Sequence, residues 1–85
     1  MPSDLTPTIR DVLREHGRLA DDVATLDDES DLFEAGLSSH ASVNLMLALE
    51  DRFDVEFSER MLHRRTFTSI ASIRACLQEL VGATT

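Results

Sequence analysis

The sequence predicts an all-α fold, a four-helix bundle of three main helices and one short third helix, on three observations. Apolar residues recur at helical spacing in several stretches, and no stretch alternates in polarity over a useful length. Serine, threonine and proline stand where helices are expected to begin. The chain has 85 residues, 42% of them hydrophobic, which suffices for one small core. We therefore predict a single domain over residues 1–85, with its core in 6–80 and flexible ends.

The first helix is predicted to begin with Thr6 as its N-cap, followed by proline, and to end at Gly17. Its inward face is marked by Ile9, Val12 and Leu13. A long loop follows over residues 18–38, with apolar residues at irregular intervals. Loops of this length are uncommon in compact domains, so we expect it to pack on the core, with one short helical turn near Leu32 and Phe33.

The strongest helix signal begins after Leu37, with Ser38 as the N-cap, and ends near Asp54. Its predicted apolar face consists of Val43, Met46, Leu47, Leu49 and Phe53. Residues 55–57 form too short and isolated a stretch for a credible strand.

Two further helices are expected in the last third of the chain. The short third helix covers residues 59–64, with Ser58 as its N-cap. Met61 and Leu62 are expected to face the core. The last helix begins at Thr68. Its apolar stripe consists of Ile70, Ile73, Leu77 and Leu80.

Composition and charge exclude several function classes. Sixteen acids against eight arginines, with no lysine, give a net charge of -8 at pH 7. Such a chain lacks the positive surface by which general nucleic-acid binders release counterions. One cysteine excludes an internal disulfide and a cysteine-rich zinc site, and no apolar run is long enough for a transmembrane helix. We expect a soluble, cytoplasmic monomer that binds neither nucleic acid nor membrane.

Charge is also distributed unevenly along the chain. Residues 27–34 contain five acids and no base, whereas residues 60–65 contain Arg60, Arg64 and Arg65. Two interpretations stay open: a solvated surface that keeps the protein soluble, or a docking surface for a charged partner.

The residues do not predict catalysis or metal binding. Ser39 and His40 are neighbours on the expected helix, where successive side chains diverge by about 100°, so they cannot pair as nucleophile and base. The acidic run from Asp27 has Leu32 and Ser38 where a calcium loop needs glycine and glutamate. We expect surface histidines, no metal site and no enzymatic activity.

The junction between the long loop and the strongest helix carries the main functional signal. Gly36 permits a sharp turn there, and Ser39 would lie in the first helical turn with an exposed hydroxyl. A phosphate ester on this hydroxyl would lie beside unpaired backbone N–H groups at the positive end of the helix dipole. The residues alone leave two possibilities open: Ser39 holds a phosphodiester, or Ser38 and Ser39 only cap the helix.

Two stretches resemble acyl carrier proteins. The first, residues 31–39, reads Asp-Leu-Phe-Glu-Ala-Gly-Leu-Ser-Ser and continues in the same register through residues 43–57. The second, residues 67–73, reads Phe-Thr-Ser-Ile-Ala-Ser-Ile and resembles the start of that family's last helix. The resemblance covers about residues 6–80. It implies an acyl-carrier-protein-like bundle that carries 4′-phosphopantetheine on Ser39, attached by a phosphopantetheinyl transferase.

Departures from that family concern partner docking. Ser38 and His40 stand where the family usually has aspartate and leucine, and Ala41 and Asn44 stand where fatty-acid carriers often have acids. The short third helix is basic instead of acidic. We predict that partners dock on the start of the site helix and on the basic segment, through Leu37, Ser38, His40, Ala41, Asn44, Arg60, Arg64 and Arg65.

The site sequence Ser-Ser-His-Ala-Ser at residues 38–42 is similar to that of a narrower group. These are small bacterial carrier proteins aminoacylated by ligases that resemble the catalytic core of seryl-tRNA synthetases. The similarity implies an amino acid cargo, such as glycine or alanine, held as a thioester and passed to a downstream acceptor enzyme. Two alternatives stay open: a carrier for fatty-acid, polyketide or nonribosomal peptide synthesis, and a non-carrier helical docking domain.

Overall fold

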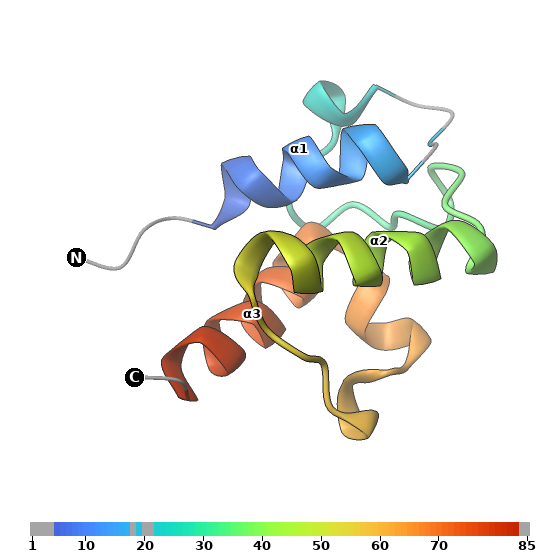
Figure 1. The fold of residues 1–85 in the computed structure, drawn as a ribbon. Coiled ribbons are helices and arrows are strands. Elements are labelled where there is room, and N and C mark those ends of the chain that lie inside the picture. The colour runs from blue at the N-terminus through green and yellow to red at the C-terminus, as the bar shows by residue number, and fades with distance from the viewer. Residues whose placement is uncertain (1–4, 18, 20–21, 84–85) are drawn as a thin grey trace.

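The computed structural model describes residues 5–17, 19 and 22–83. Figure 1 shows the helices that these residues form, in chain order α1 (Thr6–His16), η1 (Val23–Thr25), α2 (Ser39–Phe53), η2 (Glu59–Met61), η3 (Arg64–Phe67) and α3 (Ile70–Ala83), the η elements being short 3₁₀-helices. The predicted all-α fold is confirmed, and no strand occurs among the described residues. The predicted flexible ends lie outside the described residues at 1–4 and 84–85. None of the helices in the described part of the chain combines the length and the apolar character that a bilayer crossing requires.

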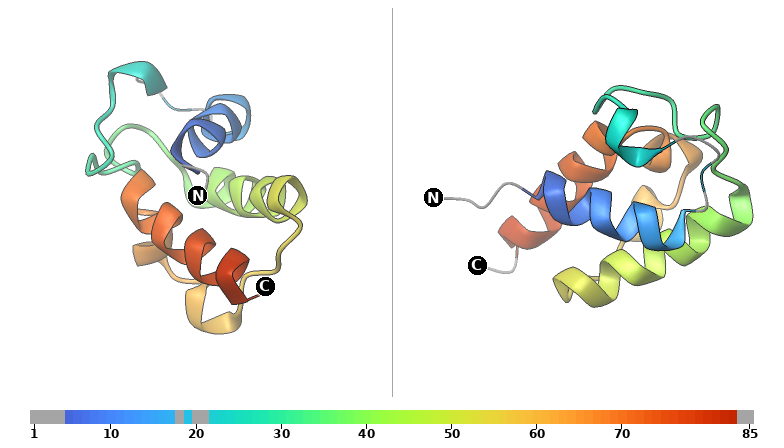
Figure 2. Two further views of the ribbon diagram at one scale, coloured as in Figure 1. Left: turned by 90° about the vertical axis from the view of Figure 1, so that its left-hand side faces the viewer. Right: turned by 90° about the horizontal axis from the view of Figure 1, so that it is seen from above.

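One hydrophobic core lies between the three α-helices. α1 packs against both α2 and α3, and η3 lies against α3, as the two views of Figure 2 illustrate. Side chains without exposed surface come from all three helices and from the loop before α2: Ile9, Leu13, Leu32, Leu45, Leu49, Ile70, Ile73 and Leu77. The predicted inward faces of α1 and α3 are thus confirmed, and the core holds α2 by one face only.

The start of α1 differs from the prediction. Leu5, not Thr6, is the N-cap residue, and no side chain caps this helix end. The Thr6 hydroxyl instead accepts a hydrogen bond of 2.8 Å from Arg74 on α3. The predicted end is confirmed at Gly17, where a Cβ atom would lie 2.7 Å from the Leu13 carbonyl oxygen, so only glycine fits without a shift.

The long loop before α2 is fixed to the bundle by an ionic cluster. Asp28 accepts hydrogen bonds from Arg10 on α1, at 2.8 Å, and from Arg74 on α3, at 2.9 Å. Arg10 also donates to the carbonyl oxygen of Val23, at 2.8 Å. The hydrogen bond from Arg74, and then that from Arg10, hold the pKa of Asp28 below its ordinary value. One residue of the acidic run therefore joins two helices instead of facing solvent with the rest.

Backbone hydrogen bonds complete this attachment. The N–H of Leu32 donates to the Thr68 carbonyl at 2.7 Å, and the N–H of Ala71 donates to the Asp28 carbonyl at 2.9 Å. The predicted turn near Leu32 and Phe33 is confirmed as a hydrogen-bonded turn over residues 32–36. The loop is therefore packed down as expected.

The segment after α2 departs most from the prediction. In place of one helix over 59–64, η2 and η3 are separated by His63 in an extended conformation. Met61 is buried as predicted, but Leu62 is 47% exposed. The Ser58 side chain caps nothing, and its oxygen is buried without a hydrogen-bond partner.

The start of α3 also lies later than predicted. The helix begins at Ile70, and Thr68 does not cap it, because its hydroxyl donates to the Arg64 carbonyl at 2.9 Å. The Ser69 hydroxyl accepts the N–H of Ser72 at 3.1 Å and so takes the capping role. The buried stripe of the helix is unaffected by this shift.

Candidate functional site

The two serines at the start of α2 have different roles. Ser38 is the N-cap in an extended conformation, and its hydroxyl oxygen accepts the N–H of Ala41 at 3.0 Å. Ser39 is the first helical residue, is exposed, and its hydroxyl has no hydrogen-bond partner among the described residues. Because Ser38 serves only one N–H, the amides of Ser39 and His40 lack an acceptor within the helix. The predicted N-cap is confirmed, and a reactive hydroxyl stands beside it.

The turn before α2 presents Ser39 in a defined position. Asp31 accepts the N–H groups of Phe33, at 2.9 Å, and Glu34, at 3.3 Å. Gly36 has a φ of 116°, in the left-handed region where glycine is unstrained. The N–H of Leu37 then donates to the Leu32 carbonyl at 2.9 Å, and both leucine side chains are buried.

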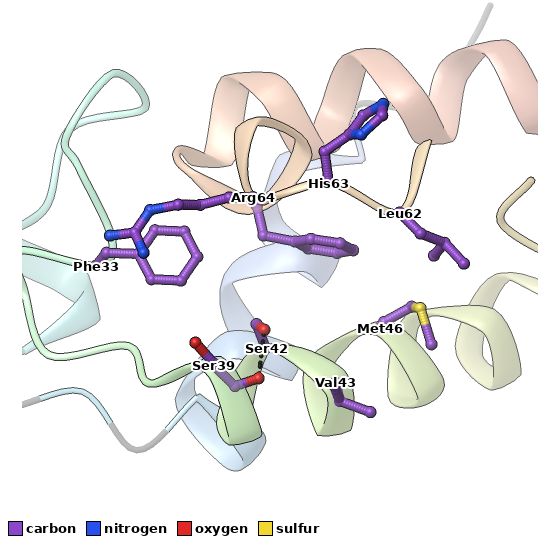
Figure 3. Close-up of a pocket in the computed structure, with 9 residues that line it drawn as sticks. Phe33, Ser39, Ser42, Val43, Met46, Leu62, His63 and Arg64 are labelled. Carbon is purple, nitrogen blue, oxygen red and sulfur yellow. Dashed lines mark hydrogen bonds between the residues drawn. The ribbon is translucent and has the colours of Figure 1, made fainter. Parts of the chain in front are cut away.

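A pocket of about 380 Å³ adjoins Ser39 (Figure 3). It lies between the first half of α2 and the segment that contains η3, and it is lined by Phe33, Ser39, Ser42, Val43, Met46, Leu62, His63, Arg64 and Phe67. The lining is mostly apolar and contains no carboxylate, although acids outnumber arginines two to one in the chain. The Ser42 hydroxyl donates to the Ser39 carbonyl oxygen at 2.6 Å, which Figure 3 shows as a dashed line.

Arg64 occupies one end of this pocket. Its guanidinium carbon lies 4.1 Å from the centre of the Phe33 ring, a cation–π contact. Phe33 belongs to the turn that leads to Ser39, so the contact joins η3 to the loop before α2. The wall of the pocket is therefore closed by two side chains that are distant in sequence.

The face of α2 that meets the core is rotated from the predicted one. The buried residues are Ala41, Leu45 and Leu49, whereas Val43 and Leu47 are 51% and 53% exposed. Of the predicted face, only Leu49 is fully buried. The outward apolar side chains of α2 thus lie on the same side of the molecule as the pocket or beside it.

The predicted docking residues do not form one continuous set. Ser38, His40 and Asn44 are exposed on the first turns of α2, and Arg65 is exposed on η3. Leu37 and Ala41 are buried in the core, so their side chains are not available to a partner. Arg60 lies 3.8 Å from Glu79 on α3, and only Arg64 shares the pocket with Ser39.

Several pocket residues escaped the sequence prediction. Val43, Met46 and Leu62 were assigned to the core because their spacing fits a buried stripe as well as a pocket wall. Phe33 and Phe67 carry no local signal that distinguishes a lining role. All three histidines are exposed as predicted, and no cluster of three or more metal-binding side chains occurs in the described part of the chain.

Comparison with known proteins identifies the family. Residues 4–77 match the family described as phosphopantetheine attachment site. The chain is 49% identical over 69 residues to a protein of Agrobacterium fabrum named aminoacyl carrier protein, which covers 81% of this chain and 83% of that protein.

Solved structures agree with this match. A chain in the crystal structure of an engineered Bradyrhizobium japonicum glycine:[carrier protein] ligase, complexed with carrier protein from Agrobacterium tumefaciens and ATP, is 45% identical. Its TM-score is 0.87, over 89% of this chain and 99% of that chain. A chain in the structure of the Bradyrhizobium japonicum ligase complexed with glycylated carrier protein is 25% identical, with a TM-score of 0.72 over 84% of this chain and 95% of that one. Because the family match spans most of the sequence, this chain belongs to the phosphopantetheine attachment site family, and it is a non-catalytic carrier protein whose prosthetic group is covalent 4′-phosphopantetheine.

Proposed function

We propose that Ser39 carries the 4′-phosphopantetheine and that the protein holds an amino acid as a thioester on this arm. The observation that supports the site most directly is the free, exposed hydroxyl of Ser39 at the start of α2, beside the pocket. The two neighbouring serine hydroxyls are engaged, that of Ser38 as the helix cap and that of Ser42 as a donor to the Ser39 carbonyl. Among the three serines, Ser39 is therefore the one whose modification costs no existing hydrogen bond.

The surroundings of Ser39 suit a phosphodiester. The N–H groups of Ser39 and His40 point out of the helix start, where the helix dipole favours negative charge. No carboxylate lines the adjoining pocket, and Arg64 and His63 do line it. When bound, the group supplies a thiol that forms the thioester with the cargo, while the chain supplies a fixed point of attachment.

An amino acid cargo follows from the relatives. The protein of Agrobacterium fabrum is named aminoacyl carrier protein, and two matched structures contain a glycine:[carrier protein] ligase. We extend this to the present chain: a phosphopantetheinyl transferase modifies it, and an amino acid:[carrier protein] ligase that resembles seryl-tRNA synthetases loads it. A downstream acceptor enzyme then takes the amino acid. Because both loading steps use cytoplasmic nucleotide substrates, the proposal includes a cytoplasmic location.

Partner docking is assigned to the exposed residues around the site. Ser38, His40 and Asn44 surround Ser39 on the first turns of α2, and Val43 and Leu47 offer exposed apolar surface on the same helix. Exposed apolar side chains rimmed by polar ones are typical of interaction sites. Arg64 and Arg65 on η3 add positive charge across the pocket.

The decisive experiment is intact-mass measurement of the purified protein with a phosphopantetheinyl transferase and coenzyme A. Wild type and Ser42→Ala should each gain one phosphopantetheine, because Ser42 lies one helical turn away but is not the attachment point. Ser39→Ala should gain nothing. Modification that persists in Ser39→Ala contradicts the assigned residue, and no modification by any of several transferases favours a helical docking domain instead.

The cargo is tested on the modified protein. Addition of a glycine:[carrier protein] ligase, ATP and glycine should give a second mass increase that hydroxylamine removes, as expected for a thioester. Loading by an acyl ligase with a fatty acid, but by no amino acid ligase, would contradict the aminoacyl proposal while leaving Ser39 as the attachment site.

A further inference from the structure

We propose that Arg64 is the counter-ion of the phosphodiester on Ser39, and that the Phe33 ring is the platform that holds Arg64 there. The inference rests on the proposed attachment at Ser39. It assigns to this chain a residue that positions the prosthetic group at its root.

The first support is the pairing of the arginines. Most described arginines are matched to a carboxylate: Arg10 and Arg74 share Asp28, Arg14 contacts Asp11 at 3.0 Å, Arg52 contacts Glu15 at 4.0 Å, and Arg60 contacts Glu79 at 3.8 Å. Arg64 and Arg65 have no such partner among the described residues. In a chain with a net charge of -8, an arginine without a carboxylate partner, beside the serine that receives a phosphate, has a charge to complement.

The second support is the position of Arg64 relative to Ser39. Both residues line the same pocket, and Figure 3 shows the Arg64 side chain extended across its end, over Phe33, with Ser39 at the start of α2 below. Arg65, the neighbour of Arg64 on η3, does not line the pocket. Proximity to the attachment point therefore distinguishes Arg64 from the other unpaired arginine.

The third support is how Arg64 is held. A guanidinium stacked on an aromatic face keeps the N–H groups at its edge available, and these form a planar fork that fits two oxygens of a phosphate. The guanidinium carbon lies 4.1 Å from the centre of the Phe33 ring. Because Phe33 and Ser39 belong to the same turn and helix start, this contact orients Arg64 without consuming the hydrogen-bond donors that the anion needs.

The consequence concerns the direction in which the arm leaves the protein. A phosphate held by Arg64 and by the free amides of α2 fixes the first bonds of the arm and directs it along the pocket between α2 and η3. The distal thiol stays free to move. Restricting the root of a long flexible group lowers the ordering cost when a partner binds it.

The test combines the presence of the arm with the presence of Arg64. Apo and phosphopantetheinylated forms are prepared for wild type, Arg64→Gln and the matched control Arg65→Gln. The ³¹P resonance of the phosphodiester is recorded in the modified forms, and the ¹⁵N–¹H signal of the Arg64 side chain is compared between apo and modified wild type. The mass spectrum first establishes that each form carries one phosphopantetheine on Ser39.

The inference predicts that the Arg64 signal shifts when the arm is attached. The ³¹P resonance should move in Arg64→Gln and stay at the wild-type position in Arg65→Gln. Added salt should bring the wild-type resonance toward that of Arg64→Gln, because the exposed pair is screened. Arg64→Lys should give an intermediate position, since it keeps the charge and loses the fork.

Two results would overturn the inference. One is an identical ³¹P resonance in wild type and Arg64→Gln, and the other is an equal displacement in Arg65→Gln, which indicates a general charge effect. Both results leave modification of Ser39 intact, whereas absence of modification at Ser39 would overturn the proposed function itself. The thermal midpoints of the apo forms show whether Arg64→Gln alters the fold, and in that case Arg64→Lys serves as the test variant.

Discussion

The connection before α2 is attached to the bundle by ions and backbone hydrogen bonds, whereas the connection after α2 is attached mainly by apolar side chains. Before α2, Asp28 joins Arg10 and Arg74, and the backbone of the loop pairs with that of the α3 region. After α2, Phe57 packs on Phe67 with ring centres 5.7 Å apart, Met61 is buried, and the buried Ser58 oxygen has no partner. Directional contacts hold the side that presents Ser39, and less directional ones hold the side that forms the far wall of the pocket.

This difference has a functional sense. The attachment point of a prosthetic group must keep its position for several enzymes, so the turn before α2 is hydrogen-bonded over its length. The opposite wall must accept an arm that comes and goes, and apolar contacts allow small shifts that hydrogen bonds would resist. The arrangement separates the fixed side of the site from the adaptable side.

The largest effect that tests this comparison comes from one leucine in each connection. Leu32→Ala should lower the free energy of unfolding by about 2–5 kcal/mol, because Leu32 is fully buried. Leu62→Ala should change it by less than about 0.5 kcal/mol, because Leu62 is 47% exposed. Urea unfolding followed by circular dichroism measures both. A loss at Leu62 as large as at Leu32 would mean that the second connection is as firmly fixed as the first.

The ionic cluster gives the next effect. Asp28→Asn should destabilise the protein by about 1–2 kcal/mol at neutral pH, because two half-buried guanidinium groups lose their counter-charge. The figure lies at the lower end for charged hydrogen bonds, since the Asp28 side chain is 37% exposed and partly screened by water. The same urea unfolding experiment measures the loss, and a stability equal to wild type would show that the cluster is dispensable.

The pH dependence of this effect has a definite sign. The folded protein holds the pKa of Asp28 below its ordinary value, so the unfolded chain takes up the proton at a higher pH than the folded one does. The contribution is therefore complete above the ordinary aspartate pKa and is lost as the pH falls through the lowered folded value. The difference between wild type and Asp28→Asn should narrow only in that acid range. A constant difference down to the acid limit of folding would assign the loss to another cause.

The sequence predicts the elements of this protein better than the contacts between them. The ends of α2 follow from local chemistry, because Ser38 caps one end and Asp54 adopts a left-handed conformation, with a φ of 55°, at the other. Thr6 was expected to cap α1 because its residue type fits, but Arg74, which is 68 residues away, takes its hydroxyl. Asp28 was one acid among five for the same reason: its partners are known only once α1 and α3 are packed.

The site itself shows a second limit. Periodicity could not choose the buried face of α2, because apolar residues cover most of its circumference, including the exposed Val43 and Leu47. Apolar residues kept at the surface for function have the same spacing as core residues. Ser39 was found from its place after a glycine turn, which is local, whereas Phe33 and Arg64 meet only through the fold.

The serines give a smaller effect on stability. Ser38→Ala should cost about 1 kcal/mol, since the Ala41 amide loses its acceptor. Ser39→Ala should stay within about 0.5 kcal/mol and still abolish attachment of the prosthetic group. Thermal unfolding of the two apo variants, together with their masses after treatment with the transferase, separates the roles. A large loss for Ser39→Ala with none for Ser38→Ala would exchange them.

The smallest effect on stability, and the one most specific to function, concerns the basic side of the pocket. Arg65 is exposed without an ion pair among the described residues, and Arg64 lies across the pocket from the first turn of α2. If the loading ligase meets this side, reversing both charges with Arg64→Glu and Arg65→Glu should slow aminoacylation of the modified carrier by about tenfold at low salt, because charge complementarity acts mainly on association. Folding should be unaffected, since both side chains are exposed.

Salt and the single variant decide between docking and the arm. Steering is screened at high ionic strength, so the defect of the double variant should shrink as salt is added. Arg65→Glu alone should retain part of the defect, because it alters the docking surface without touching the pocket that holds Arg64 and Ser39. Loading rates at several salt concentrations measure both. A wild-type rate for Arg65→Glu, with a salt-independent defect in the double variant, would place the whole effect on Arg64 and the arm, and the second connection would then serve the prosthetic group and not the ligase.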